Sequence, residues 1–120
     1  MKDLTLSCHP VLQEVFSERI RQDHKWGEQN HPDGTGEVTA VRARDHAQAE
    51  CELAFQEKRG TYRHILTEEY YEVLAETDPR KLRLELIQLA AVAVQWVEAL
   101  DRRVPELLAS RSLPDSNYLI

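Results

Sequence analysis

Apolar residues recur at steps of three and four along most of this chain, which is the spacing of one face of an α-helix. The first run of such positions is Val11, Leu12, Val15, Phe16 and Ile20. It predicts a helix from about Val11 to about Lys25. The cluster of Pro32, Asp33 and Gly34 then predicts a turn, because proline presets φ and glycine tolerates positive φ.

A second helix is predicted from about Thr39 to Lys58, with Gly60 as its C-terminal stop. One face of this segment carries small side chains, at Ala40, Ala43, Ala47, Cys51 and Ala54. Small side chains let two helix axes approach closely. We therefore expect this stripe to face another helix or another subunit.

The remaining sequence predicts two long helices and a short one. Thr61 caps a helix that runs to about Glu76, and Asp78 caps the next, with Pro79 in its first turn. This fourth helix is apolar over most of its circumference, which is typical of the central helix of a bundle. Pro105 opens a short helical turn. The chain is thus predicted to be an all-α bundle of four to five helices, with a single domain over residues 1–110 and an irregular tail over residues 111–120.

Composition narrows the class of protein. The 120 residues carry 21 Asp and Glu against 15 Lys and Arg, a net charge of −6. A binder of nucleic acid polymers would normally carry a basic excess. The sequence contains no run of 18 apolar residues, so no membrane-spanning segment is predicted. Cys8 and Cys51 share no metal or redox spacing, which favours a reduced, cytoplasmic setting.

Acidic residues crowd the third predicted helix. Its four glutamates are Glu68, Glu69, Glu72 and Glu76. Like charges at i,i+4 destabilise an isolated helix by roughly 0.2–0.5 kcal/mol per pair. At about 100° per residue, Glu69 falls inside the apolar arc that Ile65, Leu66, Tyr70, Val73 and Leu74 form. Glu72 lies at the edge of this arc, and Glu68 lies further toward solvent.

The fourth helix adds a second pair of oxygen-bearing side chains, Glu85 and Gln88, at i,i+3 spacing. In an antiparallel hairpin, residues equally distant from the turn lie at the same height. Positions 72 and 85 share their midpoint with positions 69 and 88, and this midpoint falls at the predicted turn, between Asp78 and Pro79. The pattern therefore predicts three carboxylates and one amide converging between two helices.

Such a cluster would repel itself unless a cation bound there. Ligands that are all oxygen, several of them charged, suit Mg²⁺ or Mn²⁺ rather than zinc. Mg²⁺ held by a few carboxylates typically keeps positions for water and substrate phosphates, so a polyphosphate is the expected ligand. The alternative is that these acids form an ordinary solvated face. The place of Glu69 inside the apolar arc favours the metal site.

Two segments, E-E-Y-Y-E and E-L-I-Q, are separated by residues Val73 to Leu84. Together they resemble the EExxE…ExxD signature of the all-α nucleoside triphosphate pyrophosphohydrolases, the MazG-like proteins. The resemblance covers roughly Val11 to Arg103. R-I-R-Q-D-H-K-W-G-E-Q-N-H-P-D-G also resembles an N-terminal segment of MazG-like proteins. The resemblance implies that Glu69, Glu72 and Glu85 are metal ligands, with Glu68 as a supporting group. Gln88 replaces the aspartate of the signature, so the site loses one negative charge.

The resemblance implies Mg²⁺-dependent cleavage of a nucleoside triphosphate between its α and β phosphates, giving a monophosphate and pyrophosphate. Glu69 or Glu72 is then the catalytic residue that orients the attacking water. A homodimer or homotetramer is also expected, because four helices of this length leave the small-residue stripe and the acid cluster partly uncovered.

Substrate-binding groups are predicted in two places. The loop from Trp26 to Gly34 offers a stacking face at Trp26 and hydrogen-bonding edges at Gln29, Asn30 and His31. In the alternative, Trp26 plugs the end of the bundle and the polar residues satisfy the turn. The side chains predicted to meet phosphate charge are Arg21, Lys25, Arg63 and Lys81, for which solvated surface charge is the alternative.

Two other function classes remain open. A catalytically weak helical module that binds a nucleotide or a protein would hold nucleotide without releasing pyrophosphate, and Gln88 would mark its altered metal site. A purely structural helical dimer would gain no thermal protection from nucleotide.

Overall fold

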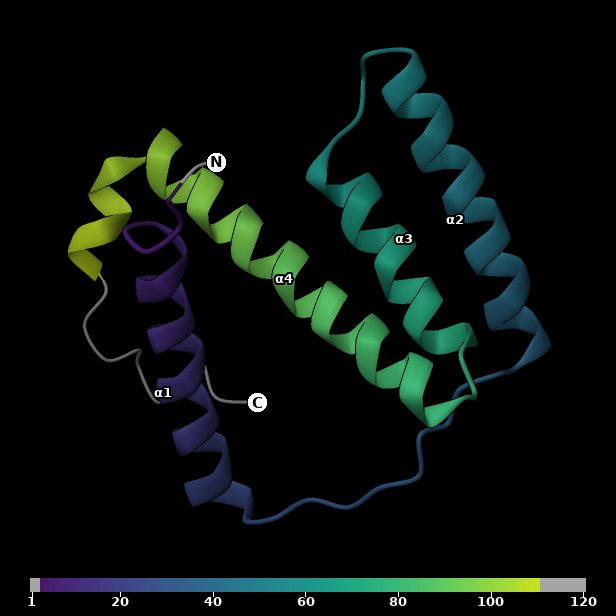
Figure 1. Cartoon of the computed structure of the whole chain (residues 1–120), viewed down its shortest axis with the longest axis horizontal. Coiled ribbons are helices and arrows are strands. Elements are labelled where there is room, and N and C mark those ends of the chain that lie inside the picture. The colour runs from purple at the N-terminus through teal and green to yellow at the C-terminus, as the bar shows by residue number, and fades with distance from the viewer. Residues whose placement is uncertain (1–2, 111–120) are drawn as a thin grey trace. The chain divides into compact units, whose positions relative to one another are not determined.

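The computed structural model describes residues 3–110, which form four α-helices and a 3-10 helix without any strand (Figure 1). The helices are α1 (Cys8–Trp26), α2 (Val38–Gln56), α3 (Tyr62–Ala75), α4 (Pro79–Arg103) and η1 (Pro105–Ser110). The prediction of an all-α fold is confirmed. The predicted tail over residues 111–120 lies outside the described residues.

The chain divides into two compact units. Pro32–Ala93 holds α2, α3 and the first part of α4, and we call it the α2–α3 unit. The α1 unit holds α1, the end of α4 and η1. No helix among residues 3–110 has both the length and the apolar content to cross a membrane.

The starts of α3 and α4 follow the predicted caps. The Thr61 hydroxyl accepts a hydrogen bond from the backbone N–H of His64 at 3.3 Å, and His64 Nδ1 accepts one from the backbone N–H of Thr61 at 3.2 Å. This reciprocal pair satisfies two donors that a helix start would otherwise leave unpaired. At α4, Asp78 Oδ1 accepts from the N–H of Arg80 at 3.0 Å, directly after the Pro79 position. The contact at Asp78 thus lies at the turn between α3 and α4, where the cap was predicted.

The end of α2 differs from the prediction. We expected Gly60 to stop the helix, but Lys58 is the residue with a left-handed backbone, at φ 60°. The N–H groups of Lys58 and Arg59 bond back to the carbonyls of Phe55 and Ala54, which is the Schellman arrangement. Gly60 is instead needed for space, because a Cβ there would lie 2.5 Å from the Phe55 ring.

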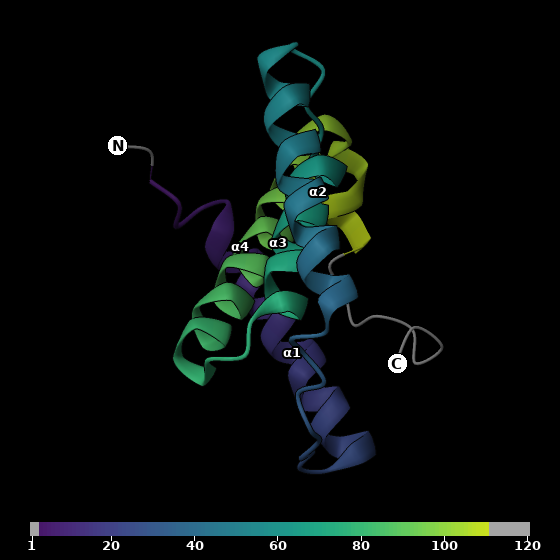
Figure 2. The same ribbon diagram turned by 90° about the vertical axis from the view of Figure 1, so that its right-hand side faces the viewer.

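Helices α2 and α3 run antiparallel and lie side by side in both views (Figures 1 and 2). Ala47, Cys51 and Ala54 of α2 are buried, and Ala54 is 0% exposed. Ala40 and Ala43, at the start of the same stripe, are half-buried. The prediction that small residues bring α2 against another helix is therefore confirmed for the inner part of the stripe.

Large apolar side chains stay exposed on both units of the single chain. On α1, Leu12, Val15, Phe16 and Ile20 are 47, 47, 61 and 55% exposed. On α4, Leu84, Leu86 and Ile87 are 54, 46 and 55% exposed. The apolar surface that predicted a central fourth helix is therefore partly uncovered in one chain.

Gly36 ties the loop before α2 to the end of α3, since its N–H donates to the Leu74 carbonyl at 2.9 Å. Its φ is 93°, and an added Cβ would lie 2.3 Å from Cγ2 of Thr77. We expect Gly36→Ala to lower the free energy of unfolding by about 2 kcal/mol, from backbone strain plus this clash. Gly34→Ala is the control, because Gly34 also has positive φ but has nothing within 4 Å of the added Cβ. Urea denaturation of both variants checks the difference, and equal losses would contradict the proposed clash.

Candidate metal centre

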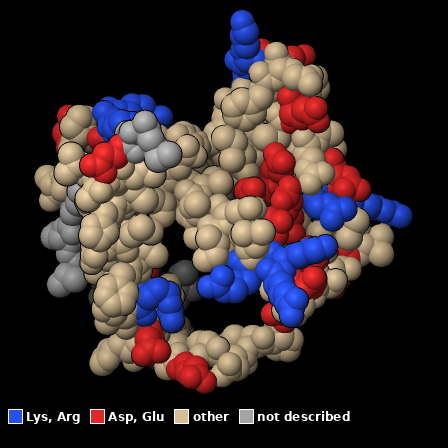
Figure 3. Space-filling model, viewed as in Figure 1, with Lys and Arg blue, Asp and Glu red and all other residues tan. Residues whose placement is uncertain are grey.

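Three carboxylates converge between α3 and α4. Glu69 and Glu72 come from α3 and Glu85 from α4, and one ligand atom from each lies within 4.8 Å of the others. All three side chains are half-buried. This is the meeting of Glu72 with Glu85 that equal distance from the turn at Asp78 and Pro79 predicts. Figure 3 shows acidic side chains gathered over α3.

Two oxygens of this cluster are buried without a donor. Oε2 of Glu69 and Oε2 of Glu85 have no hydrogen-bond partner among the described residues. Glu72 has a donor from outside the cluster, because Gln48 Nε2 of α2 donates to its Oε1 at 2.9 Å. Buried carboxylate oxygens without a donor are costly. The cluster therefore has unused capacity to bind a positive charge or a proton.

The pKa values show how strongly these groups disfavour a second or third negative charge. Burial is the largest cause that raises the pKa of Glu85, to about 7, followed by the hydrogen bond and charge of Glu72 and then by Glu69. The pKa of Glu69 is raised first by burial and then by the charges of Glu72 and Glu68, while a hydrogen bond with Glu85 lowers it. Two carboxyl groups can share a hydrogen bond only when one holds a proton. A proton on one of these carboxyl groups, or a bound cation, would relieve the repulsion among them.

Glu68 does not lie where the sequence predicts. It is half-buried rather than turned to solvent, and it forms a hydrogen bond with the Cys51 thiol on α2. Burial, then this hydrogen bond and the charge of Glu68, raise the pKa of Cys51 to about 11. The position of α2 explains the error, because α2 covers the face of α3 that the sequence pattern leaves open. Tyr70 differs in the opposite sense: it belongs to the predicted apolar arc but is 47% exposed.

The amide predicted to join the carboxylates is less enclosed than they are. Gln88 is exposed and makes no hydrogen bond among the described residues. Its role as a fourth ligand stays a prediction. Lys81 is exposed in the first turns of α4, where Figure 3 shows basic side chains gathered below the acidic ones. Positive charge therefore lies on the same hairpin as the cluster.

The donor set of the cluster fits a hard divalent cation. It consists of carboxylate oxygens alone, and two of them are buried without a donor. Mg²⁺ and Mn²⁺ prefer such oxygen ligands, whereas zinc prefers nitrogen and sulfur. Glu69, Glu72 and Glu85 are the residues that would hold the ion.

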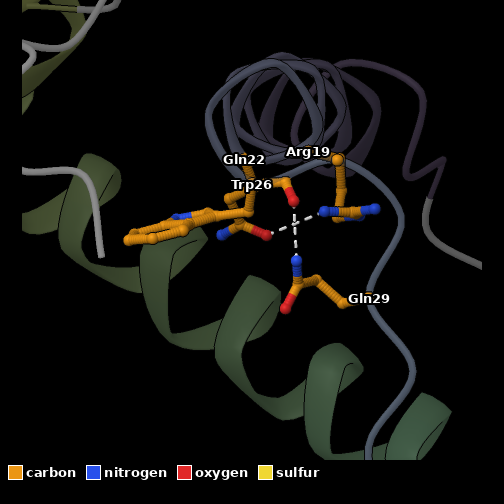
Figure 4. A pocket seen from close by; sticks show the side chains of 5 residues that line it. Arg19, Gln22, Trp26 and Gln29 are labelled. Carbon is orange, nitrogen blue, oxygen red and sulfur yellow. Dashed lines mark hydrogen bonds between the residues drawn. The ribbon is translucent and has the colours of Figure 1, made fainter.

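A pocket in the α1 unit includes Trp26 and Gln29, two of the residues predicted to form the base pocket. Arg19, Gln22, Trp26, Gly27 and Gln29 line this open pocket of about 300 Å³ (Figure 4). Arg19 donates to Oε1 of Gln22 at 2.9 Å, and Gln29 Nε2 donates to the Trp26 carbonyl at 2.7 Å. Trp26 is 53% exposed. The binding role of this pocket stays a prediction.

Other predicted substrate groups are engaged locally. Asn30 donates to Glu28 at 3.0 Å, and His31 Nε2 donates to Gln29 Oε1 at 2.8 Å, which fits the alternative that they satisfy the turn. The Lys25 ammonium lies 5.0 Å from the centre of the Trp26 ring.

Arg21 is the least exposed of the predicted phosphate-binding side chains. It pairs with Glu18, and its Nε and Nη1 atoms are buried without a partner among the described residues. Arg63 is exposed beside α2, and it lines a groove that does not contain the three carboxylates.

The sequence reasoning missed Gln48. Its signal was present, since Gln48 follows the buried Ala47 and precedes Cys51 by three residues, which places it beside the small-residue stripe. A polar side chain next to a helix contact often bonds to the facing helix. Gln48 orients the carboxylate of Glu72 and so supports the cluster from α2.

The raised pKa of Glu85 predicts a pH dependence of stability in the metal-free protein. A carboxyl group whose pKa rises from 4.5 to about 7 on folding stabilises the fold fully below pH 4.5, and this contribution is lost as the pH rises through 7. Because the group is only partly buried, we expect a loss on the order of 1 to 2 kcal/mol.

Urea denaturation with a chelator, at pH 5 and pH 8, measures this loss. Glu85→Gln should remove most of the difference, because the amide does not titrate. A wild-type protein whose difference between the two pH values matches that of the variant would contradict the assignment.

No family model, no curated protein and no solved structure matches this chain.

Proposed function

We propose that this protein is a Mg²⁺-dependent nucleoside triphosphate pyrophosphohydrolase, with Mn²⁺ as a possible substitute. One observation carries the proposal: Glu69, Glu72 and Glu85 present ligand atoms within 4.8 Å of one another on a single helical hairpin. The E-E-Y-Y-E and E-L-I-Q segments, which resemble the MazG-like signature, supply the same three residues.

The proposed reaction is attack of water on the α-phosphorus of a nucleoside triphosphate, with cleavage of the α–β anhydride bond. Its products are a nucleoside monophosphate and pyrophosphate, as the resemblance implies. Glu69 or Glu72 orients the water and accepts its proton. Gln48 holds Glu72 in place through its hydrogen bond at 2.9 Å. The metal ion, when bound, neutralises phosphate charge and makes bound water more acidic.

A nucleotide-binding module without catalysis is the second candidate. The exposed Gln88 favours it, because an amide at this position gives the site one negative charge fewer than the aspartate of the signature. Such a module would bind nucleotide and gain thermal stability from it, but it would release no pyrophosphate.

A panel of nucleoside and deoxynucleoside triphosphates, assayed for pyrophosphate release with Mg²⁺, with Mn²⁺ and with a chelator, separates the two candidates. Release that requires the metal supports the enzyme. Nucleotide binding without release, across the whole panel, would reject it in favour of the binding module.

We also propose that the protein acts as a homodimer or homotetramer. Exposed apolar side chains on α1, with Phe16 at 61%, support association, because a large apolar patch on a chain of this size usually marks an interface. Sedimentation should give at least twice the chain mass of 13.9 kDa. Phe16→Glu should weaken association by at least about tenfold. Gln13→Glu adds the same charge beside the apolar positions and should leave the mass unchanged; a monomeric wild-type protein would overturn the proposal.

A further inference from the structure

A groove of about 360 Å³ lies on the α2–α3 unit, apart from the acid cluster. Its lining residues come from α2, from α3 and from the turn between them. They are Ala43, His46, Ala47, Glu50, Arg59, Arg63, His64, Thr67 and Tyr71. None of the three clustered carboxylates belongs to this set. The groove is therefore a separate feature with its own chemistry.

The groove exists because small side chains line part of it. Ala43 and Ala47 occupy successive turns of the α2 face, so they leave space between the two helices that larger residues would fill. Tyr71 of α3 lines the same space and adds an aromatic surface. A ligand with an apolar or planar body would find matching surface here.

Basic side chains gather at the end of the groove that lies at the α2–α3 turn. Arg63 is exposed and has no hydrogen bond or ion pair within the described part of the chain. Arg59 uses only Nε, which donates to Glu57 at 2.8 Å. Its two terminal nitrogens are not bonded to any described residue. Two guanidinium groups thus keep most of their donors available beside one cavity.

His64 adds an imidazole ring to the wall of the groove. The backbone N–H of Thr61 donates to Nδ1 of His64, and a backbone N–H can only donate. Nδ1 is therefore unprotonated in the capping pair, and Nε2 carries the ring hydrogen. Among the described residues nothing accepts a hydrogen bond from Nε2. His64 therefore contributes an N–H donor in the wall of the groove next to Arg63.

The acidic side chains around the groove limit where an anion can bind. Glu50 Oε1 lies 4.0 Å from Nε2 of His46, which is also on α2. Glu50 precedes Gln56, the last residue of α2, by six residues, which is about 9 Å along the helix axis. Glu57 is already paired with Arg59. The end at the turn is thus the part of the groove with net positive charge.

We propose that this groove is a second ligand site, which binds a phosphate group at Arg59, Arg63 and His64. Guanidinium groups bind phosphate through two parallel hydrogen bonds, and an imidazole N–H adds a further donor. The phosphate is either free or part of a small phosphate ester whose body lies along Ala47 and Tyr71. The proposal does not depend on the function of the acid cluster.

Calorimetric titration of the full chain, with a chelator present to exclude metal, tests the proposal. The three probes are inorganic phosphate, pyrophosphate and AMP. A higher affinity for AMP than for inorganic phosphate would identify a phosphate ester as the ligand. We expect saturable binding that Arg63→Gln and Arg59→Gln each weaken by about tenfold or more, as loss of a charged hydrogen bond predicts. Arg42→Gln, an exposed arginine on α2 outside the groove, should change the affinity less than about twofold.

Glu72→Gln separates this site from the acid cluster, because it should leave the affinity for all three probes unchanged. Absence of binding up to about 10 mM would overturn the proposal. Equal weakening by Arg42→Gln would also overturn it, because binding would then depend on nonspecific charge. A change of oligomeric state in Arg63→Gln without loss of affinity would overturn it as well, because the groove would then be an interface between subunits. Circular dichroism of each variant verifies that the helices are intact.

Discussion

Replacing Glu72 with glutamine is expected to lower the rate of metal-dependent pyrophosphate release by about two to four orders of magnitude. The negative charge of Glu72 raises the pKa of both Glu69 and Glu85. Glu72 also accepts a hydrogen bond from α2, at Gln48. Glutamine keeps the size of the side chain but removes a negative charge and one acceptor, so both metal affinity and proton transfer should suffer.

The matched control is Glu52→Gln, because Glu52 is exposed on α2 and belongs to neither the cluster nor the groove. Its activity should stay within about twofold of the wild-type protein. Initial rates at several Mg²⁺ concentrations distinguish weaker metal binding, which excess Mg²⁺ rescues, from a lost base, which it does not. Full activity in Glu72→Gln would refute the assignment of the ligands.

Replacing Ala54 with leucine is expected to lower the free energy of unfolding by about 3 kcal/mol. Ala54 is 0% exposed, and its carbonyl accepts the hydrogen bond from Arg59 that closes the end of α2. A leucine side chain has no room there without separating α2 from the elements packed on it. Because α2 carries Gln48, we also expect the separation to loosen the support of Glu72.

Ala49→Leu is the control for this variant, since Ala49 lies on the same helix but is exposed. That substitution should change stability by less than about 0.5 kcal/mol. Chemical denaturation monitored by circular dichroism compares the two. If both variants lose the same stability, the buried contact of the small-residue stripe is not what holds α2 in place.

The hairpin of α3 and α4 was the part of the fold most open to prediction. Asp78 and Pro79 fix where the chain turns, and helices have a constant rise per residue, so the heights of Glu72 and Glu85 follow from counting. The same arithmetic needs no knowledge of the side-chain packing. For this reason the meeting of Glu69, Glu72 and Glu85 was predicted correctly from spacing alone.

Features that depend on α2 were not predictable in the same way. A stripe of small residues does not reveal which helix covers it, or how that helix is rotated about its own axis. Glu68 was therefore placed toward solvent, although it contacts Cys51, and the hydrogen bond from Gln48 to Glu72 was missed. Lys58, not Gly60, takes the left-handed backbone after α2, and Gly60 is instead the position where the Phe55 ring leaves no room for a Cβ.

The groove of the α2–α3 unit was missed for a related reason. Arg63 was predicted to meet substrate phosphate near the carboxylates, but it lines a groove that contains none of the three. The capping pair of Thr61 and His64 determines the ring orientation, and only the coordinates show that Ala43 and Ala47 leave a cavity beside it. A cavity is a property of two surfaces, so neither helix alone predicts it.

The protonated state of Cys51 has a practical consequence for spectroscopy. The chain has two free cysteines, and the one on α2 is buried with a pKa of about 11, so almost none of it is the nucleophilic thiolate at neutral pH. A maleimide dye or a nitroxide spin label should attach to Cys8 at the start of α1 without any mutation. Slow modification of Cys51 would then measure how often α2 opens away from α3.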